Sequence, residues 1–187
     1  MPNKRDQVVE TAERLFYREG FHATGIDRVI AEAGVARMTL YNHFPSKDDL
    51  VLAVLRRRDE AYWAALSAAA ETARANGQSG AQAVVEAHGH WLQTRSPHGC
   101  LFLKALGEYG EHAAAIADAA LAHKRRGIAF LREQVQADGH APDGGLPERL
   151  ALLMEGATAY AQVLPPEQAI AQSLAAARTL LDTPATP

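Results

Sequence analysis

Residues 24–47 read TGIDRVIAEAGVARMTLYNHFPSK, and this stretch predicts two short helices joined by a tight turn. Thr24 and Asp27 fit the capping-box pattern, in which a hydroxyl and a carboxylate three residues later satisfy the free N–H groups of a new helix. Apolar residues then recur at helical spacing, at positions 26, 29, 30 and 33. Gly34 predicts the end of this helix, because glycine adopts the left-handed conformation of a C-terminal cap without strain.

The second helix of the stretch is expected from about Ala36 to Phe44. At about 100° per residue, Ala36, Leu40 and Phe44 share one side, and Met38 and Asn42 lie opposite. Two helices joined by a short turn containing glycine are typical of DNA-binding proteins, whose second helix enters the major groove. An ordinary pair of helices in a small bundle is the alternative interpretation.

The start of the next helix carries a second capping box, which runs from Ser46 to Asp49 directly after Pro45. The N-terminal amides of this helix and the charge of Lys47 could hold a DNA phosphate. Lys4 and Arg5 precede the first helix of the chain and could reach phosphates too, although a solvated helix start explains them equally well.

Residues 24–50 resemble the TetR/AcrR family of bacterial transcriptional repressors. The resemblance lies in the pattern G-V…T-L-Y…F…S-K-x-x-L, which runs from Gly34 to Leu50 and is rarely found elsewhere. Ala36 departs from it, because the family usually has a serine N-cap there and its loss costs about 1 kcal/mol. Met38 replaces a small residue and His43 an aromatic one, and both changes suggest an individual operator preference.

The residue types on the outward face of the second helix suit DNA. Asparagine can pair with adenine, methionine can contact a thymine methyl group, and Thr and Tyr hydroxyls suit phosphate oxygens. We expect Met38, Asn42 and Arg37 to set the sequence preference. The full set of expected DNA contacts is Thr24, Arg28, Arg37, Met38, Thr39, Tyr41, Asn42, His43 and Lys47.

Composition favours an all-α chain. Of the 187 residues, 48% are hydrophobic, which is enough for a real core, and alanine and leucine make up most of that share. Residues 1–58 hold ten Lys and Arg against eight Asp and Glu, whereas the remainder hold nine against fourteen. We expect a three-helix helix-turn-helix head at 1–50, a larger helical effector-binding and dimerisation body at 51–182, and a disordered tail at 183–187.

The body should contain helices at about 47–75, 81–94 and 111–137, followed by two helices that Pro165 and Pro166 separate. The first of these begins in the head, so it could carry motion between head and body. The resemblance implies that the last two helices pack against their copies in a homodimer. The residues expected in that interface are the apolar stripes Leu150, Leu153, Met154, Ala157, Ala161 and Leu164, and Ile170, Leu174, Ala177 and Leu181.

The resemblance also implies a small-molecule effector, and aromatic side chains of the body are candidates for its pocket, although aromatic residues at helical spacing are more often plain core. The candidates are Trp63, Trp91, Phe102, Tyr109 and Tyr160. His88 and His90 lie two residues apart, so they point to different sides of a helix, and we expect neither a metal site nor a cofactor. For Cys100 we expect a buried, unreactive thiol, with an oxidant sensor as the alternative.

The sequence therefore indicates a DNA-binding regulator, and we expect a repressor that a small-molecule inducer releases from a palindromic operator. A ligand-independent repressor or an activator of the same fold remains open. A helical small-molecule-binding protein or an enzyme with a structural head is the rival from another class, but no catalytic or phosphate-binding motif is present, so we expect no enzyme. A single cysteine and the lack of a long apolar stretch favour the cytoplasm.

Overall fold

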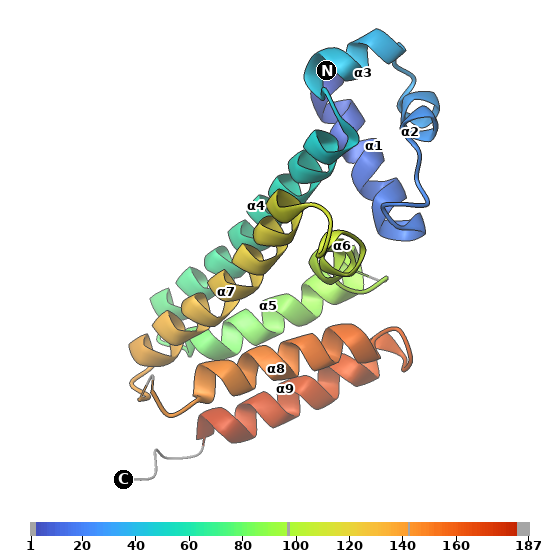
Figure 1. The fold of residues 1–187 in the computed structure, drawn as a ribbon. Helices are drawn as coiled ribbons and strands as arrows, with labels where there is room; N and C mark the ends of the chain where they lie inside the picture. Colours follow the sequence, from blue (N-terminus) through green and yellow to red (C-terminus); the bar gives the residue numbers. More distant parts are fainter. Residues whose placement is uncertain (1–2, 97, 142, 183–187) are drawn as a thin grey trace. The chain divides into compact units, whose positions relative to one another are not determined.

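The computed structural model describes residues 3–96, 98–141 and 143–182, and in these residues all regular secondary structure is α-helical (Figure 1). The prediction of an all-α chain is confirmed. The tail predicted at 183–187 lies outside the described residues. The helices are α1 (Lys4–Glu19), α2 (Ile26–Ala33), α3 (Arg37–His43), α4 (Lys47–Ala75), α5 (Gly80–Arg95), α6 (Leu101–Tyr109), α7 (Ala114–Ala137), α8 (Leu146–Tyr160) and α9 (Pro166–Asp182).

The chain separates into two compact units. The first unit combines the residues up to Glu60 with Leu101–His123, and the second combines Ala61–Cys100 with the residues from Lys124 onward. Two helices, α4 and α7, therefore contribute residues to both units. The predicted boundary at residue 50 stays a prediction, and α6 joins the first unit although it follows α5 in the sequence.

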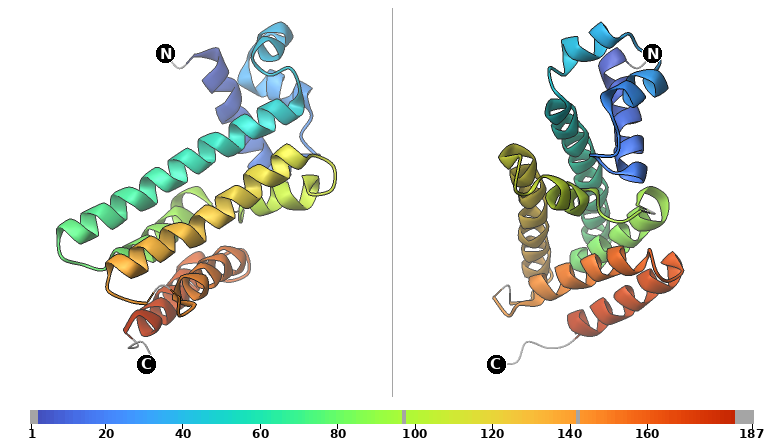
Figure 2. Two further views of the ribbon diagram at one scale, coloured as in Figure 1. Left: turned by 60° about the vertical axis from the view of Figure 1, so that its left-hand side comes forward. Right: turned by 45° about the vertical axis from the view of Figure 1, so that its right-hand side comes forward.

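In the first unit, α1 packs against both α2 and α3 (Figures 1 and 2). Its apolar face is buried, with Leu15 and Phe16 fully inside. The Gln7 side-chain amide donates to the Ala33 carbonyl at 2.9 Å, which ties the start of α1 to the end of α2. Gly34 has φ +60° and ψ 37°, so it ends α2 in the left-handed conformation expected of it.

The two capping boxes differ. Ser46 and Asp49 form one: the Asp49 N–H donates to Ser46 Oγ at 3.1 Å, and the Ser46 N–H donates to Asp49 Oδ2 at 3.0 Å. The box predicted at Thr24 is wrong, because Gly25 occupies the N-cap of α2 and no side chain caps it. Thr24 is buried, and its hydroxyl donates to the Gly20 carbonyl at 2.8 Å.

α6 is hydrogen-bonded to the end of α1 and to the turn that follows it. The Phe21 and His22 N–H groups donate to the Glu108 carboxylate at 3.0 and 2.6 Å. Lys104 Nζ donates to the Tyr17 carbonyl at 2.7 Å. α6 therefore holds the backbone of the turn that connects α1 to α2.

In the second unit, α5, α8 and α9 lie side by side, as both figures show (Figures 1 and 2). Their buried faces join residues of α4 and α7 in one core that includes Leu66, Val84, Leu131 and Leu150. Ser173 Oγ donates to the Leu153 carbonyl at 3.1 Å and so links α9 to α8.

Asp138, just after α7, caps the start of α5. Its carboxylate accepts hydrogen bonds from the Gly80 and Ala81 N–H groups, each at 2.9 Å, and from Ser79 Oγ at 2.7 Å. These N–H groups have no partner within the helix, so a carboxylate at this position stabilises α5.

The apolar stripes predicted to meet a partner chain are mostly used within the chain itself. Leu153 and Leu174 are half-buried against the core, and Leu164 is exposed in the turn after α8. The other members are buried, so the prediction that their side chains form a dimer surface is wrong for Leu150, Met154, Ala157, Ala161, Ile170, Ala177 and Leu181. Within the described residues, no helix combines the length and the apolar character required to cross a membrane.

Candidate nucleic-acid interface

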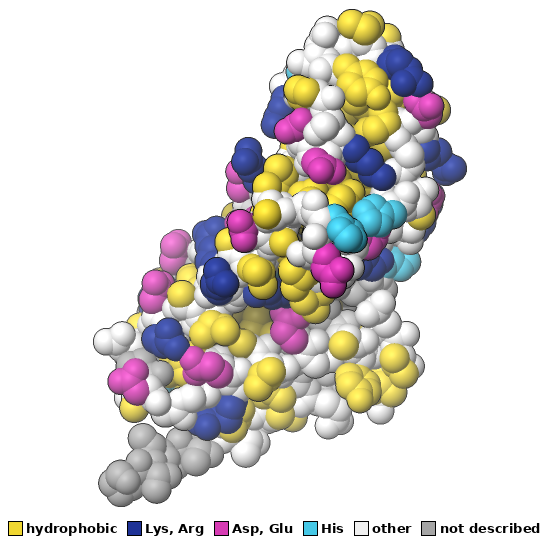
Figure 3. All heavy atoms as spheres, viewed as in Figure 1, with side chains coloured by type: hydrophobic (Ala, Val, Ile, Leu, Met, Phe, Trp, Pro, Cys, Tyr) yellow, Lys and Arg dark blue, Asp and Glu magenta, His cyan; other side chains and the backbone are white. Residues whose placement is uncertain are grey.

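α3 has one buried side and one exposed side. Leu40 and the C-cap residue Phe44 are buried, and they anchor the helix to the rest of the first unit. Met38 is 68% exposed, and Tyr41 is also exposed. Figure 3 shows hydrophobic side chains over α3 next to lysine or arginine side chains. Ala36, expected on the inner side, is exposed instead, because it is the N-cap and stands outside the helix proper.

Asn42 and His43 complete the exposed side of α3, and Thr39 is partly exposed. Lys47 opens α4 and is partly buried, which lowers its pKa, while the Glu108 and Asp48 carboxylates act in the opposite direction. These groups combine an amide, hydroxyls, a thioether and a cation on the outside of one helix and the start of the next. Such groups can make both base-edge and phosphate contacts.

Two of the predicted arginine contacts are held by acidic side chains. The Arg37 guanidinium donates a hydrogen bond to Asp27 Oδ1, which joins α3 to α2. Arg28 Nη2 lies 3.2 Å from Glu32 Oε1 and 3.7 Å from Glu19 Oε1. Both arginines remain exposed, so each could reach DNA.

Thr24 does not fit the predicted DNA-contact set. It has no exposed surface, and its hydroxyl donates a hydrogen bond to the Gly20 carbonyl in the turn after α1. Conversely, Arg5 lies in the first turn of α1 with its guanidinium 5.5 Å from the centre of the Phe44 ring. The sequence placed Arg5 in an arm before the helix, and nothing in it indicated this contact with the end of α3.

The aromatic residues proposed for an effector pocket are divided between the two units. Trp63 and Trp91 both pack edge-on against Tyr62 in the second unit, at ring distances of 5.0 and 5.3 Å. Tyr109 contacts Phe21 in the first unit at 5.8 Å. Phe102 also belongs to the first unit, where it stacks on His123 at 3.6 Å. Tyr160 is 60% exposed at the end of α8.

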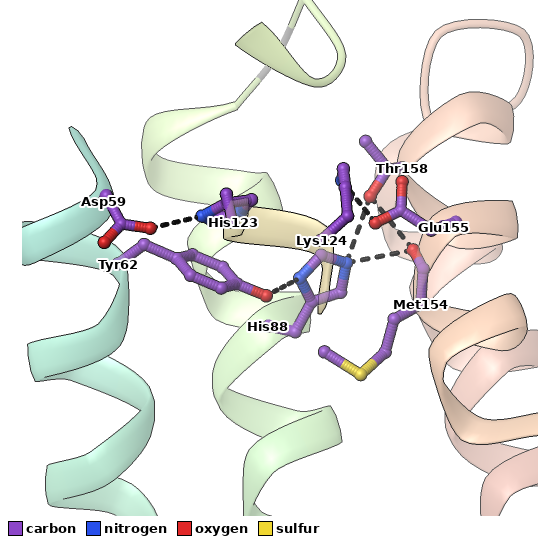
Figure 4. Close-up of polar contacts among 8 residues, drawn as sticks. All are labelled: Asp59, Tyr62, His88, His123, Lys124, Met154, Glu155 and Thr158. Atoms are coloured by element: carbon purple, nitrogen blue, oxygen red, sulfur yellow. Dashed lines mark hydrogen bonds and ion pairs between the residues drawn. The ribbon is translucent and has the colours of Figure 1, made fainter. Parts of the chain in front are cut away.

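A buried polar network in the second unit was not foreseen (Figure 4). His88 Nε2 lies 3.0 Å from the Met154 carbonyl, which can only accept, so Nε2 carries a proton. His88 Nδ1 then accepts from the Tyr62 hydroxyl at 3.0 Å, and burial raises the pKa of that phenol. The Thr158 hydroxyl donates to the same carbonyl at 2.9 Å. The sequence reading had weighed His88 only as a metal ligand beside His90, which is exposed.

Figure 4 also shows an ion pair between Lys124 Nζ and Glu155 Oε1 at 2.5 Å. Burial lowers the pKa of Lys124, but Cys100 and Glu155 outweigh this effect and leave it raised. Cys100 is half-buried rather than fully buried. In the first unit, His123 Nδ1 lies 2.6 Å from Asp59 Oδ1 (Figure 4).

The head matches a known family. Residues 8–54 fit the model of bacterial regulatory proteins of the tetR family. FasR, a transcriptional activator from Mycolicibacterium smegmatis, is 44% identical over 54 residues, which are 29% of this chain and 25% of FasR. The match to the first two curated relatives covers only about a quarter of the length of each of those proteins.

Solved structures extend the match to the body. The multidrug binding protein EbrR, complexed with malachite green, shares the fold over 97% of this chain and 100% of that chain, with a TM-score of 0.75 and 20% identity. SCO4454, a TetR-family transcriptional regulator from Streptomyces coelicolor, is 34% identical, covers 95% of this chain and 94% of that chain, and has a TM-score of 0.88. Because identity at this level spans nearly both whole chains, the chain belongs to the TetR family of transcriptional regulators.

Proposed function

We propose that this DNA-binding regulator is a cytoplasmic repressor that binds a palindromic operator as a homodimer and leaves it when a small molecule binds its second unit. The observation that supports this best is the division of α3 into a buried side, with Leu40 and Phe44, and an exposed side, with Met38, Tyr41 and Asn42. A helix anchored in this way can enter a major groove with its exposed side towards the bases.

The proposed DNA surface uses the exposed members of the predicted set together with one addition from the structure. Met38, Asn42 and Arg37 would contact base edges, and the remaining residues would contact phosphates. Thr24 is omitted because it is buried. The phosphate contacts are Arg5, Arg28, Thr39, Tyr41, His43 and Lys47.

The proposed dimer surface is the outer face of α8 and α9 rather than their buried stripes. Leu152 is 72% exposed, and helical spacing places Gly156 on the same side of α8. Val163, in the turn after α8, is 76% exposed. Figure 3 shows hydrophobic side chains around the turn between α8 and α9. Small residues let two helices approach closely, and a Cβ atom added at Gly156 would meet nothing from the rest of the chain within 4 Å.

Release by an effector requires a physical link between the two units. α4 and α7 each supply residues to both, and α6 is hydrogen-bonded to the turn before α2. The aromatic side chains around Tyr62 are the candidates for contact with an effector. EbrR, which shares the fold, is a multidrug binding protein.

Selection of bound fragments from random DNA tests the proposal. We expect a two-fold symmetric motif whose half-sites lie about 34–36 Å apart, one helical turn of DNA. Affinity for that motif should fall steeply as salt rises. Candidate effectors are then screened for release of the purified protein from the recovered duplex. An enriched motif without two-fold symmetry would contradict the homodimer, and increased expression of a reporter on addition of the protein would indicate an activator.

A further inference from the structure

Asp27 contacts Arg37 across the turn between α2 and α3. Its Oδ1 accepts a hydrogen bond from Arg37 Nη2, and both side chains are largely exposed. Asp27 lies in the first turn of α2, but the N-cap of that helix makes no side-chain hydrogen bond. The carboxylate is therefore not an N-cap and lies outside the core, and its favourable interaction with the dipole of α2 needs no contact with Arg37.

The contribution of this ion pair to folding is small. Exposed pairs contribute about 0.2–1 kcal/mol, since water and salt screen them. A negative charge beside α3 also opposes DNA binding, because it repels the phosphates that the surrounding cations attract. A role in DNA recognition would explain why a carboxylate stands there.

Arg37 is the only arginine of α3, and its guanidinium has five N–H donors in a rigid fork. An unpaired arginine at this position would gain from contact with any phosphate. With Asp27 holding Nη2, the charge of the pair is balanced and the remaining donors keep one orientation. Only a partner whose acceptors match this orientation, such as O6 and N7 of guanine, then adds much binding free energy.

We infer that Asp27 is a specificity-determining residue, which orients Arg37 towards a base edge and weakens its attraction to phosphates at large. The inference rests on the proposed DNA surface, in which Arg37 faces the bases. It predicts that removing the Asp27 charge strengthens binding to unrelated DNA and lowers the preference for the operator.

The test compares wild type with Asp27→Asn, which keeps the size of the side chain. Random-DNA selection is run with each protein, and the dissociation constants are measured for the wild-type operator and for an unrelated duplex of equal length. We expect Asp27→Asn to bind the unrelated duplex about two- to fivefold more tightly, the range that an exposed ion pair can supply. The ratio of the two affinities should fall, and the selected motif should lose its preference at one base position in each half-site.

Three control variants separate orientation of Arg37 from a general effect of charge. Asp48→Asn removes an equal charge from the first turn of α4 and should leave the affinity ratio unchanged. Asp27→Glu keeps the charge and should retain most of the preference. In an Arg37→Ala background, Asp27→Asn should no longer alter the ratio.

The inference is wrong if Asp27→Asn strengthens binding to both duplexes equally, or if its effect on the ratio persists without Arg37. Neither result would affect the proposed DNA surface, which has its own test. If Asn42→Ala leaves operator binding unchanged, that surface itself is wrong.

Discussion

Gly89 of α5 lies so close to Ile170 of α9 that a Cβ atom at position 89 would stand 2.7 Å from Ile170 Cγ2. Gly89→Ala should therefore destabilise the protein by about 1–3 kcal/mol, because α9 must shift or Ile170 must leave its rotamer. Urea unfolding measures the change. Gly107→Ala in α6, where an added Cβ meets nothing within 4 Å, is the matched control and should be neutral or stabilising. Equal effects of the two substitutions would contradict the close packing.

Glu108 on α6 holds the turn after α1 through two backbone N–H groups. Glu108→Gln weakens both hydrogen bonds, since an amide oxygen accepts less strongly than a carboxylate. The expected cost is about 1 kcal/mol, and the Phe21 amide should exchange its hydrogen faster. Glu111→Gln, just after α6, is the control and should leave that exchange rate unchanged. A Phe21 exchange rate that Glu108→Gln does not alter would show that the turn is held by other contacts.

Stability at alkaline pH should depend on Tyr109. Burial raises the pKa of this phenol to about 12, with smaller contributions from Asp48 and Glu108. The folded protein then holds the proton more tightly than the unfolded chain does, so the contribution to stability is full below about pH 10 and is lost as the pH rises towards 12. Unfolding of wild type and Tyr109→Phe is compared between pH 9 and 11. The wild type should lose more stability over this range, and parallel losses would contradict the prediction.

Tyr41 and Asn42 should act differently on DNA although they are neighbours on the exposed side of α3. Tyr41→Ala should weaken binding to all sequences alike, because its hydroxyl is assigned to a phosphate. Asn42→Ala should relax the preference at one base position by about 1–3 kcal/mol. A binding assay over a library of operator variants distinguishes the two effects. The reverse pattern would refute these roles.

Gly156 provides a test of the proposed dimer surface. Gly156→Arg should leave the fold of the single chain intact, since an added Cβ atom meets nothing within 4 Å and the long side chain can extend towards solvent. It should block the close approach of a second α8 and convert dimers to monomers in analytical ultracentrifugation, with a loss of operator affinity. Gly107→Arg, at an equally open position on α6, should remain dimeric. A dimeric Gly156→Arg protein would place the interface elsewhere.

Local signals predicted the helix boundaries of the first unit well. Gly34 and the Ser46–Asp49 pair act through a few neighbouring residues, so the sequence contains all the information they need. Thr24 failed because its hydroxyl bonds to Gly20 at the end of α1, a contact that competes with capping. The pattern alone could not distinguish an N-cap at Thr24 from one at Gly25.

Periodicity identified the apolar stripes of α8 and α9 but not what covers them. Met154 and Ala177 are buried because α5 lies against both helices. The spacing of apolar residues shows that one side of a helix is buried, but it does not show whether the same chain or a partner chain covers that side. Leu152, which no stripe included, is 72% exposed. Tyr160 was likewise predicted to line a pocket because it is aromatic. It is the last residue of α8, and its residue type alone does not indicate whether it faces the core or solvent.

Asp138 and the start of α5 are distant in sequence but form one junction through three hydrogen bonds. The carboxylate stands before the glycine-rich segment that leads to α8, so a protease cut between Gly144 and Gly145 would leave α7 and α5 attached to each other. A fluorescent tag, or new chain ends made by circular permutation, should therefore be placed in that segment. The residues around Ser79 are unsuitable, because they form the hydrogen bonds to Asp138.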